Sequence, residues 1–77
     1  MDKKKEIDVY IGSKLKEMRE AKNFSLRYVA NRIGKSNVTI SHYESGRNAT
    51  DLPTLKKLCN LYDVDMLQFL SDIYDKL

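Results

Sequence analysis

Between residues 25 and 46, the spacing of apolar residues and glycines predicts two short helices joined by a tight turn. Apolar residues fall at i, i+3, i+4 and i+7 of one helical face: Leu26, Val29, Ala30 and Ile33. Gly34 follows this stripe as a residue that ends helices, and Ser36 offers a hydroxyl as the N-cap of the next segment. Gly46 then closes that second segment.

The second short helix, expected over residues 37–44, has two unlike faces. Only Ile40 and Tyr43 are expected to point inward. The opposite face carries short polar and small side chains that are unsuited to a core: Asn37, Val38, Ser41 and His42. Such side chains can reach base edges, and the pair of helices has the layout of a DNA-reading helix-turn-helix motif.

The same spacing extends into a longer pattern. The A-x-x-x-G spacing of Ala30 and Gly34 says little alone, but I-S-x-Y-E-x-G follows at a fixed distance and ends at Gly46. The residues that carry the pattern are Ile11, Leu15, Arg19, Ser25, Ala30, Ile33, Gly34, Ser36, Thr39, Ile40, Ser41, Glu44, Gly46, Leu52, Leu55, Leu58 and Val64. About sixty residues, from Ile11 to Leu70, therefore resemble the phage-repressor and Cro-type helix-turn-helix family, also called Xre-like.

Two departures from the family pattern affect the expected DNA contacts. The family usually has Gln after the position of Ser25, where the amide contacts a phosphate, but this chain has Leu26. Arg27 is the expected substitute. The family also tends to have Pro where Thr50 stands, whereas the chain's only proline is Pro53. Pro53 fits the first turn of a fourth helix, where its missing N–H costs nothing, with Asp51 as the N-cap.

The pattern predicts an all-α fold of five helices in one small domain that covers residues 1–77. The first helix is expected over about 8–22 and the fourth over about 52–62. The helix-turn-helix core lies at about 25–46, and the last helix is expected over about 65–76. Phe24 is expected to pack in front of the N-cap Ser25.

Composition narrows the cellular setting. The single Cys59 rules out an intramolecular disulfide and stands in an apolar stripe, which favours core packing in a reducing cytoplasm. The N-terminus is charged and is followed by no apolar run of signal-peptide length. No segment approaches the roughly 20 apolar residues that span a bilayer. A soluble, cytoplasmic protein without a membrane partner is expected.

The net charge of +3 is unevenly distributed. Residues 1–50 hold eleven Lys or Arg against six Asp or Glu, and residues 51–77 hold three against five, so the two parts carry +5 and −2. An ordinary solvated surface could also be asymmetric. Together with the helix-turn-helix pattern, however, the asymmetry favours a polyanion as the partner of the first part.

Other chemistries find little support in the sequence. His42 is the only imidazole, and no second His or Cys lies near it to complete a metal site. The three glycines, Gly12, Gly34 and Gly46, are too dispersed for a phosphate-binding glycine-rich loop. Paired carboxylates sit at turn and helix-surface spacings, where capping and solvation explain them. We therefore expect no enzyme activity, no cofactor and no metal.

The resemblance also implies an ion pair. In the family, residues at the positions of Arg19 and Glu44 form a bidentate, partly buried pair that ties the DNA-reading helix to the first helix. The alternative is that they are two independent surface charges.

The last helix carries more apolar residues than one stripe needs. Four of them recur at spacings of four, three and four, the rhythm of a seam between helices: Met66, Leu70, Ile73 and Leu77. Three others are expected to pack inward: Leu67, Phe69 and Tyr74. The first set predicts a two-fold symmetric homodimer interface, unless a different protein or a further C-terminal domain covers that face.

Two functions from different classes follow. The first is a homodimeric, sequence-specific transcription regulator that binds a palindromic operator in double-stranded DNA. Asn37, Val38, Ser41 and His42 would then read bases. The residues expected to contact phosphates are Arg27, Lys35, Ser36, Thr39, Arg47 and Asn48. The second is a protein-interaction module, antitoxin-like or a regulatory partner, that binds through its apolar last helix while DNA contact is secondary or absent.

Overall fold

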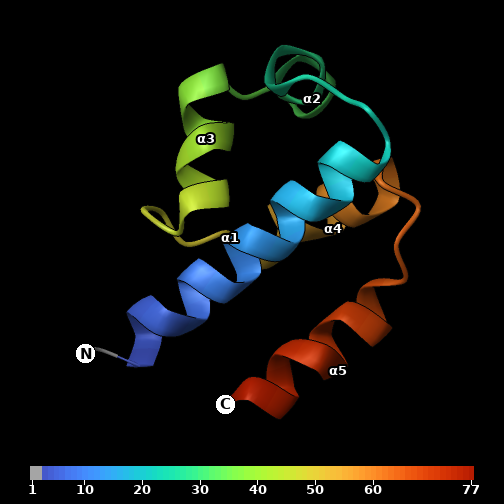
Figure 1. Ribbon diagram of the computed structural model, residues 1–77. Coiled ribbons are helices and arrows are strands. Elements are labelled where there is room, and N and C mark those ends of the chain that lie inside the picture. The colour runs from blue at the N-terminus through green and yellow to red at the C-terminus, as the bar shows by residue number, and fades with distance from the viewer. Residues whose placement is uncertain (1–2) are drawn as a thin grey trace.

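The computed structural model describes residues 3–77, with side chains from Lys5 onward, and this part of the chain folds into five helices without a strand (Figure 1). The helices are α1 (Lys3–Ala21), α2 (Leu26–Ile33), α3 (Asn37–Ser45), α4 (Leu52–Leu61) and α5 (Met66–Lys76). The predicted all-α, five-helix architecture is confirmed. α1 begins five residues before the expected Asp8, and its added first turns hold Lys5, whose Nζ donates to the Gly46 carbonyl oxygen at 2.9 Å.

The helix starts follow from local side-chain chemistry. Ser25 Oγ accepts from the Tyr28 N–H at 3.0 Å, and Ser36 Oγ accepts from the Thr39 N–H at 3.1 Å. Asp51 Oδ1 accepts from the Thr54 N–H at 2.8 Å, which confirms the N-cap predicted before Pro53. Each cap satisfies a backbone donor that a helix start otherwise leaves unpaired.

The helix ends depend on left-handed residues. Gly34 (φ 72°) and Gly46 (φ 79°) end α2 and α3 in that conformation, which glycine adopts without steric cost. Asn23 (φ 60°) and Asp63 (φ 58°) take the same conformation after α1 and α4. Asn and Asp tolerate it better than other side chains, so the two turns form without glycine.

One apolar core joins all five helices. Its members are Leu15, Val29, Ala30, Ile33, Ile40, Tyr43, Leu55, Leu58, Cys59, Tyr62, Phe69 and Ile73. Cys59 is fully buried, as predicted, and burial raises the pKa of its thiol. α1 runs diagonally through the molecule, with α2 and α3 on one side of it and α5 on the opposite side (Figure 1).

The predicted faces of the last helix were partly wrong. Phe69 is buried as expected, but Ile73 is also buried, whereas Leu67 and Tyr74 are 78% and 74% exposed. Two stripes at helical spacing exist on α5, and the one that meets the core is Met66, Phe69, Leu70 and Ile73. Ile73 therefore belongs to the core and is unsuited to a seam with a partner.

α1 and α3 approach each other so closely that glycine is required at their contact. A Cβ on Gly12 would overlap the Tyr43 carbonyl oxygen and lie 2.6 Å from that of Glu44. A Cβ on Gly46 would lie 2.6 Å from Val9 Cα. Backbone, rather than a flexible side chain, occupies the space at both positions, so the crossing cannot adapt cheaply to a larger residue.

We predict that Gly12→Ala destabilises the fold by about 1–3 kcal/mol, because the added methyl pushes α1 away from the end of α3. This loss should exceed the gain of about 1 kcal/mol in helix propensity. Urea unfolding measures the difference. Ser13→Ala on the exposed side of the same helix is the control and should leave stability nearly unchanged. Equal midpoints for the two variants would contradict the close approach.

Candidate nucleic-acid interface

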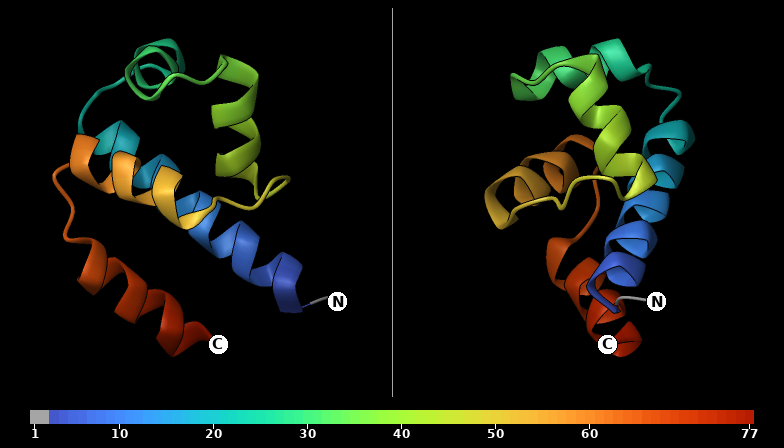
Figure 2. Two further views of the ribbon diagram at one scale, coloured as in Figure 1. Left: turned by 180° about the vertical axis from the view of Figure 1, so that it is seen from behind. Right: turned by 90° about the vertical axis from the view of Figure 1, so that its left-hand side faces the viewer.

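α3 presents one side of its surface away from the other helices. Three of the four side chains expected to read bases, Asn37, Val38 and Ser41, are exposed, and Val38 is 61% exposed. His42 is half-buried. α3 lies toward the viewer in the right panel of Figure 2. Its Ile40 and Tyr43 side chains are buried in the core.

The start of α3 combines free backbone donors with a cation. Ser36 Oγ caps the Thr39 N–H and lies 2.9 Å from Thr39 Oγ1, so both hydroxyls are held at the helix start. Within the described residues, the Asn37 and Val38 N–H groups have no protein acceptor. With Lys35 exposed beside them, they form a surface suited to a phosphate, since the positive end of the helix dipole points there.

The loop after α3 folds back on its helix. The Arg47 N–H donates to the His42 carbonyl oxygen at 2.9 Å, and the Asn48 N–H donates to the same oxygen at 3.2 Å. Both side chains remain exposed, as does Arg27 on α2. The residues expected to contact phosphates are thus all exposed except Thr39, which is half-buried.

A shallow depression of about 200 Å³ opens between α1, α2 and α3. Its lining is Lys16, Arg19, Leu26, Ser41, Glu44 and Ser45. Leu26 occupies the position where the family usually contacts a phosphate through Gln, so the depression lies where that contact is missing. Sequence reasoning missed Lys16, although it lies one helical turn before Arg19 on the same face of α1.

Arg19 ties three segments together. Its Nε donates to Glu44 Oε2 at 2.7 Å and its Nη2 donates to Glu44 Oε1 at 3.1 Å, which makes the pair bidentate. Its Nη1 donates to the Phe24 carbonyl oxygen at 2.8 Å. The two charged side chains are 12% and 7% exposed, so they are not independent surface charges. The hydrogen bond to Glu44 is the main cause that raises the pKa of Arg19.

Tyr62 extends this cluster to the end of α4. Its ring is buried, and burial, followed by the nearby Glu44 charge, raises the pKa of its hydroxyl. The phenol therefore stays neutral at ordinary pH. Phe24 lies between Tyr62 and Tyr28, with ring centroids 6.3 and 4.5 Å away, and so closes the core in front of the Ser25 cap.

Other kinds of site find no counterpart in the part of the chain that is described. Residues 3–77 contain no group of three His, Cys, Asp or Glu side chains arranged to hold a metal ion. None of their helices combines the length and apolarity needed to cross a membrane.

A model of the helix-turn-helix family matches residues 15–69, more than half of the chain. The chain belongs to this family of DNA-binding transcription regulators. The resemblance to phage repressors and Cro-type proteins is thereby confirmed.

Individual relatives agree with the family assignment. The chain is 40% identical over 50 residues to the HTH-type transcriptional regulator AnsR of Bacillus subtilis and 33% identical over 60 residues to the cryptic phage CTXphi transcriptional repressor RstR of Vibrio cholerae. These alignments cover 65% and 78% of the chain but 43% and 54% of the relatives. A 53% identical stretch of 45 residues, 58% of the chain, matches 14% of an HTH-type regulatory protein of Methanocella arvoryzae. The chain thus spans about half or less of these relatives.

We predict that Arg19→Ala lowers the free energy of unfolding by about 3–5 kcal/mol, because Glu44 is left buried without its partner. Glu44→Ala should cost a similar amount, and the double variant less than the sum of the two. Thermal and urea unfolding measure these losses.

The exposed pair of Lys22 and Asp63 is the matched control, since its N–O distance is 2.8 Å but its side chains are 37% and 75% exposed. Lys22→Ala should cost at most about 1 kcal/mol. Equal losses from Lys22→Ala and Arg19→Ala would show that burial adds nothing to the Arg19–Glu44 pair.

Proposed function

We propose that this protein is a sequence-specific transcriptional regulator that binds a palindromic operator as a homodimer, with α3 as the recognition helix in the major groove. The proposal rests on the way in which α3 is fixed to the rest of the protein. The helix is capped at both ends and is held to α1 by a buried bidentate ion pair, while Asn37, Val38 and Ser41 face outward. A rigid helix with exposed short side chains suits direct readout of base edges.

Base contacts would begin at the first turn of α3. The Asn37 amide can donate to N7 of adenine and accept from the N6 amino group of the same base. This bidentate pairing discriminates adenine from other bases. The Val38 methyl groups suit the thymine methyl. Ser41 and the half-buried His42 lie one turn further along, so they would read adjacent base pairs or support the first two side chains.

Phosphate contacts would flank the recognition helix on two sides. Lys35, with Ser36, Thr39 and the free N–H groups of α3, would hold one phosphate at the helix start. Arg47 and Asn48 would hold another from the loop after α3. Lys16 lines the depression beside Leu26, and the exposed Arg27 follows Leu26 in the chain, so an ammonium or guanidinium would replace the amide contact usual in the family. Such contacts position the protein without reading sequence.

The relatives favour repression as the regulatory outcome. The relative from Vibrio cholerae is named a phage transcriptional repressor, and that from Bacillus subtilis a transcriptional regulator.

The exposed stripe of α5 supports a two-fold dimer. Leu67, Tyr74 and Leu77 are each more than 70% exposed and recur at seven and three residues, with the half-buried Leu70 between them. This is the spacing of a helix seam, and it replaces the stripe expected from the sequence. Two copies joined along it would present two recognition helices, which fit half-sites about 34–36 Å apart.

A second function rests on the same stripe. Apolar side chains this exposed also suit a different protein as partner, so a protein-interaction module remains the alternative. The two functions differ in what covers α5. A stable homodimer with enriched palindromic DNA supports the regulator, whereas a monomer that enriches no sequence from a random duplex pool supports the interaction module.

We predict that Asn37→Ala weakens binding to the selected operator by roughly 1–3 kcal/mol and relaxes the preference at one base step, with little effect on random DNA. Lys35→Ala should weaken binding to both alike and lower the slope of log K against log salt by about one. Fluorescence polarisation at several salt concentrations separates the two effects.

Lys14→Ala is the control for these variants, because the Lys14 ammonium lies over the Tyr10 ring at 5.7 Å, on a face of α1 toward α5. Its DNA affinity should stay close to that of the unchanged protein. Equal losses of Asn37→Ala on operator and random DNA would remove Asn37 from base readout.

We predict that Leu67→Asp with Tyr74→Asp yields folded monomers, because both side chains are exposed in the protomer and a seam cannot bury two added carboxylates. Affinity for the full palindrome should fall far more than affinity for a half-site. Sedimentation measures the first result and polarisation the second. Gln68→Lys, on another exposed side of α5, is the control. A monomeric unchanged protein at tens of micromolar, with and without palindromic DNA, would contradict the dimer.

A further inference from the structure

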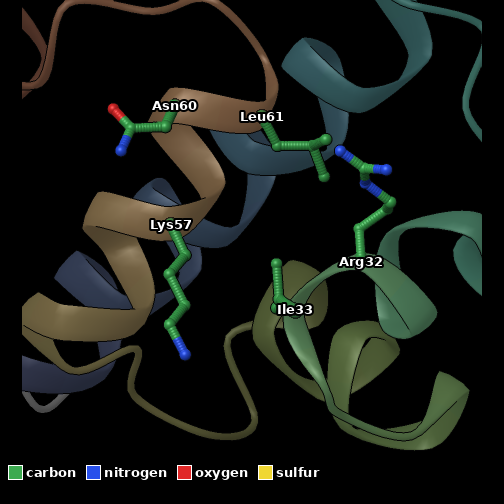
Figure 3. Close-up of a pocket in the computed structure, with 5 residues that line it drawn as sticks. All are labelled: Arg32, Ile33, Lys57, Asn60 and Leu61. Atoms are coloured by element: carbon green, nitrogen blue, oxygen red, sulfur yellow. The ribbon is translucent and has the colours of Figure 1, made fainter.

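An open groove lies between α2 and α4, with a volume of about 380 Å³ (Figure 3). Its lining is Arg32, Ile33, Lys57, Asn60 and Leu61. Two cations and one amide thus border a hollow with two aliphatic side chains, and no acidic residue lines it. None of these residues belongs to the base-reading set on α3.

The floor of the groove is apolar. In Figure 3 the Ile33 side chain points into the space between the two helices, and the Leu61 side chain extends from α4 toward the Arg32 guanidinium. Leu61 is half-buried and packs against the core, while Ile33 is a core member with an edge left at the groove. An aliphatic side chain of a ligand would remove apolar surface from water there, which is favourable in proportion to the area covered.

The two cations are available to a ligand. No ion pair found among the described residues involves Arg32 or Lys57. The Arg32 guanidinium lies over the Tyr28 ring, with Cζ 5.8 Å from its centroid. A guanidinium steadied on an aromatic ring loses less conformational freedom when it binds a carboxylate, and its planar fork fits a carboxylate in two-point contact.

The mixture of charges and aliphatic side chains distinguishes a peptide from DNA. A DNA backbone offers phosphates but no apolar group that would fill the space between Ile33 and Leu61. A peptide offers both carboxylates and aliphatic side chains. The groove is formed by the last turn of α2 and the second half of α4, and its lining includes none of the residues of the proposed phosphate contact at the start of α3.

We propose that the α2–α4 groove binds an acidic segment of another protein, with carboxylates on Arg32 and Lys57 and one aliphatic side chain between them against Ile33 and Leu61. Asn60 lies at the edge, where its amide can bond to the backbone of the segment. A regulator with this site would contact a protein partner through residues of α2 and α4, none of which belongs to α3.

The test uses the full chain and a fluorescein-labelled acidic peptide in which four Glu residues surround one Leu. We expect saturable binding by fluorescence polarisation and amide shifts in ¹H–¹⁵N spectra centred on Ile33, Asn60 and Leu61. Arg32→Glu and Lys57→Glu should each weaken the peptide by about tenfold or more, because each replaces an attraction with a repulsion. Changing the peptide's Leu to Ala should also weaken it, since the apolar floor is then left uncovered.

Lys56→Glu is the matched control, with the same charge change at the neighbouring exposed position of α4 outside the groove lining. It should leave peptide affinity within about twofold of the unchanged protein. Melting curves establish that all three variants fold, as expected for exposed side chains.

Three results would overturn the proposal. One is an equal loss for Lys56→Glu and Arg32→Glu, and another is an affinity that does not depend on the peptide's Leu. Both would indicate general attraction between charges. The third is a duplex of random sequence that shifts the groove amides while Arg32→Glu lowers the salt dependence of DNA binding, which would make the groove a phosphate contact.

Discussion

The buried contact between Arg19 and Glu44 fixes α3 against α1, and much of the remaining architecture depends on it. The Arg19 guanidinium binds the Glu44 carboxylate near the end of α3 and the Phe24 carbonyl oxygen before α2. Both helices of the motif are therefore positioned relative to α1. Two buried charges are costly to remove from water, and the cost is offset only when the geometry is good and other donors are satisfied. Bidentate geometry and the third hydrogen bond meet that condition.

Gly12 is what permits this contact to form at short range. Without a Cβ, α1 lies directly against the carbonyl groups of Tyr43 and Glu44, and Lys5 closes the far end of the crossing through the Gly46 carbonyl oxygen. A glycine inside a helix reduces its stability by roughly 1 kcal/mol relative to alanine. The chain accepts that loss at Gly12 because a side chain there would separate Arg19 from Glu44. At Gly12, the close approach of α1 to α3 thus outweighs the loss in helix propensity.

Helix boundaries could be predicted from the sequence, whereas contacts between residues far apart in the chain could be predicted less well. Ser36, Gly34 and Asp51 act within a few residues of their own position, so the end of α2 and the starts of α3 and α4 were predicted from the local sequence. Gly12 acquires its role only when α1 crosses α3, and the sequence marks Lys16 only by its position one turn before Arg19. On α5, two stripes have helical spacing, and only the packed structure shows that Ile73 meets the core while Leu67 faces out.

The position of α1 relates the proposed dimer seam on α5 to α3, the proposed recognition helix. α3 packs on one side of α1 around Gly12, while Lys14 of α1 and Lys76 of α5 both place their ammonium groups over the Tyr10 ring, at 5.7 and 5.5 Å. α1 therefore packs against both helices, α3 on one side and α5 on the other (Figure 1). In a two-fold dimer joined through α5, the distance between recognition helices would be set by rigid packing. Half-site spacing would then be selected as strictly as the bases themselves.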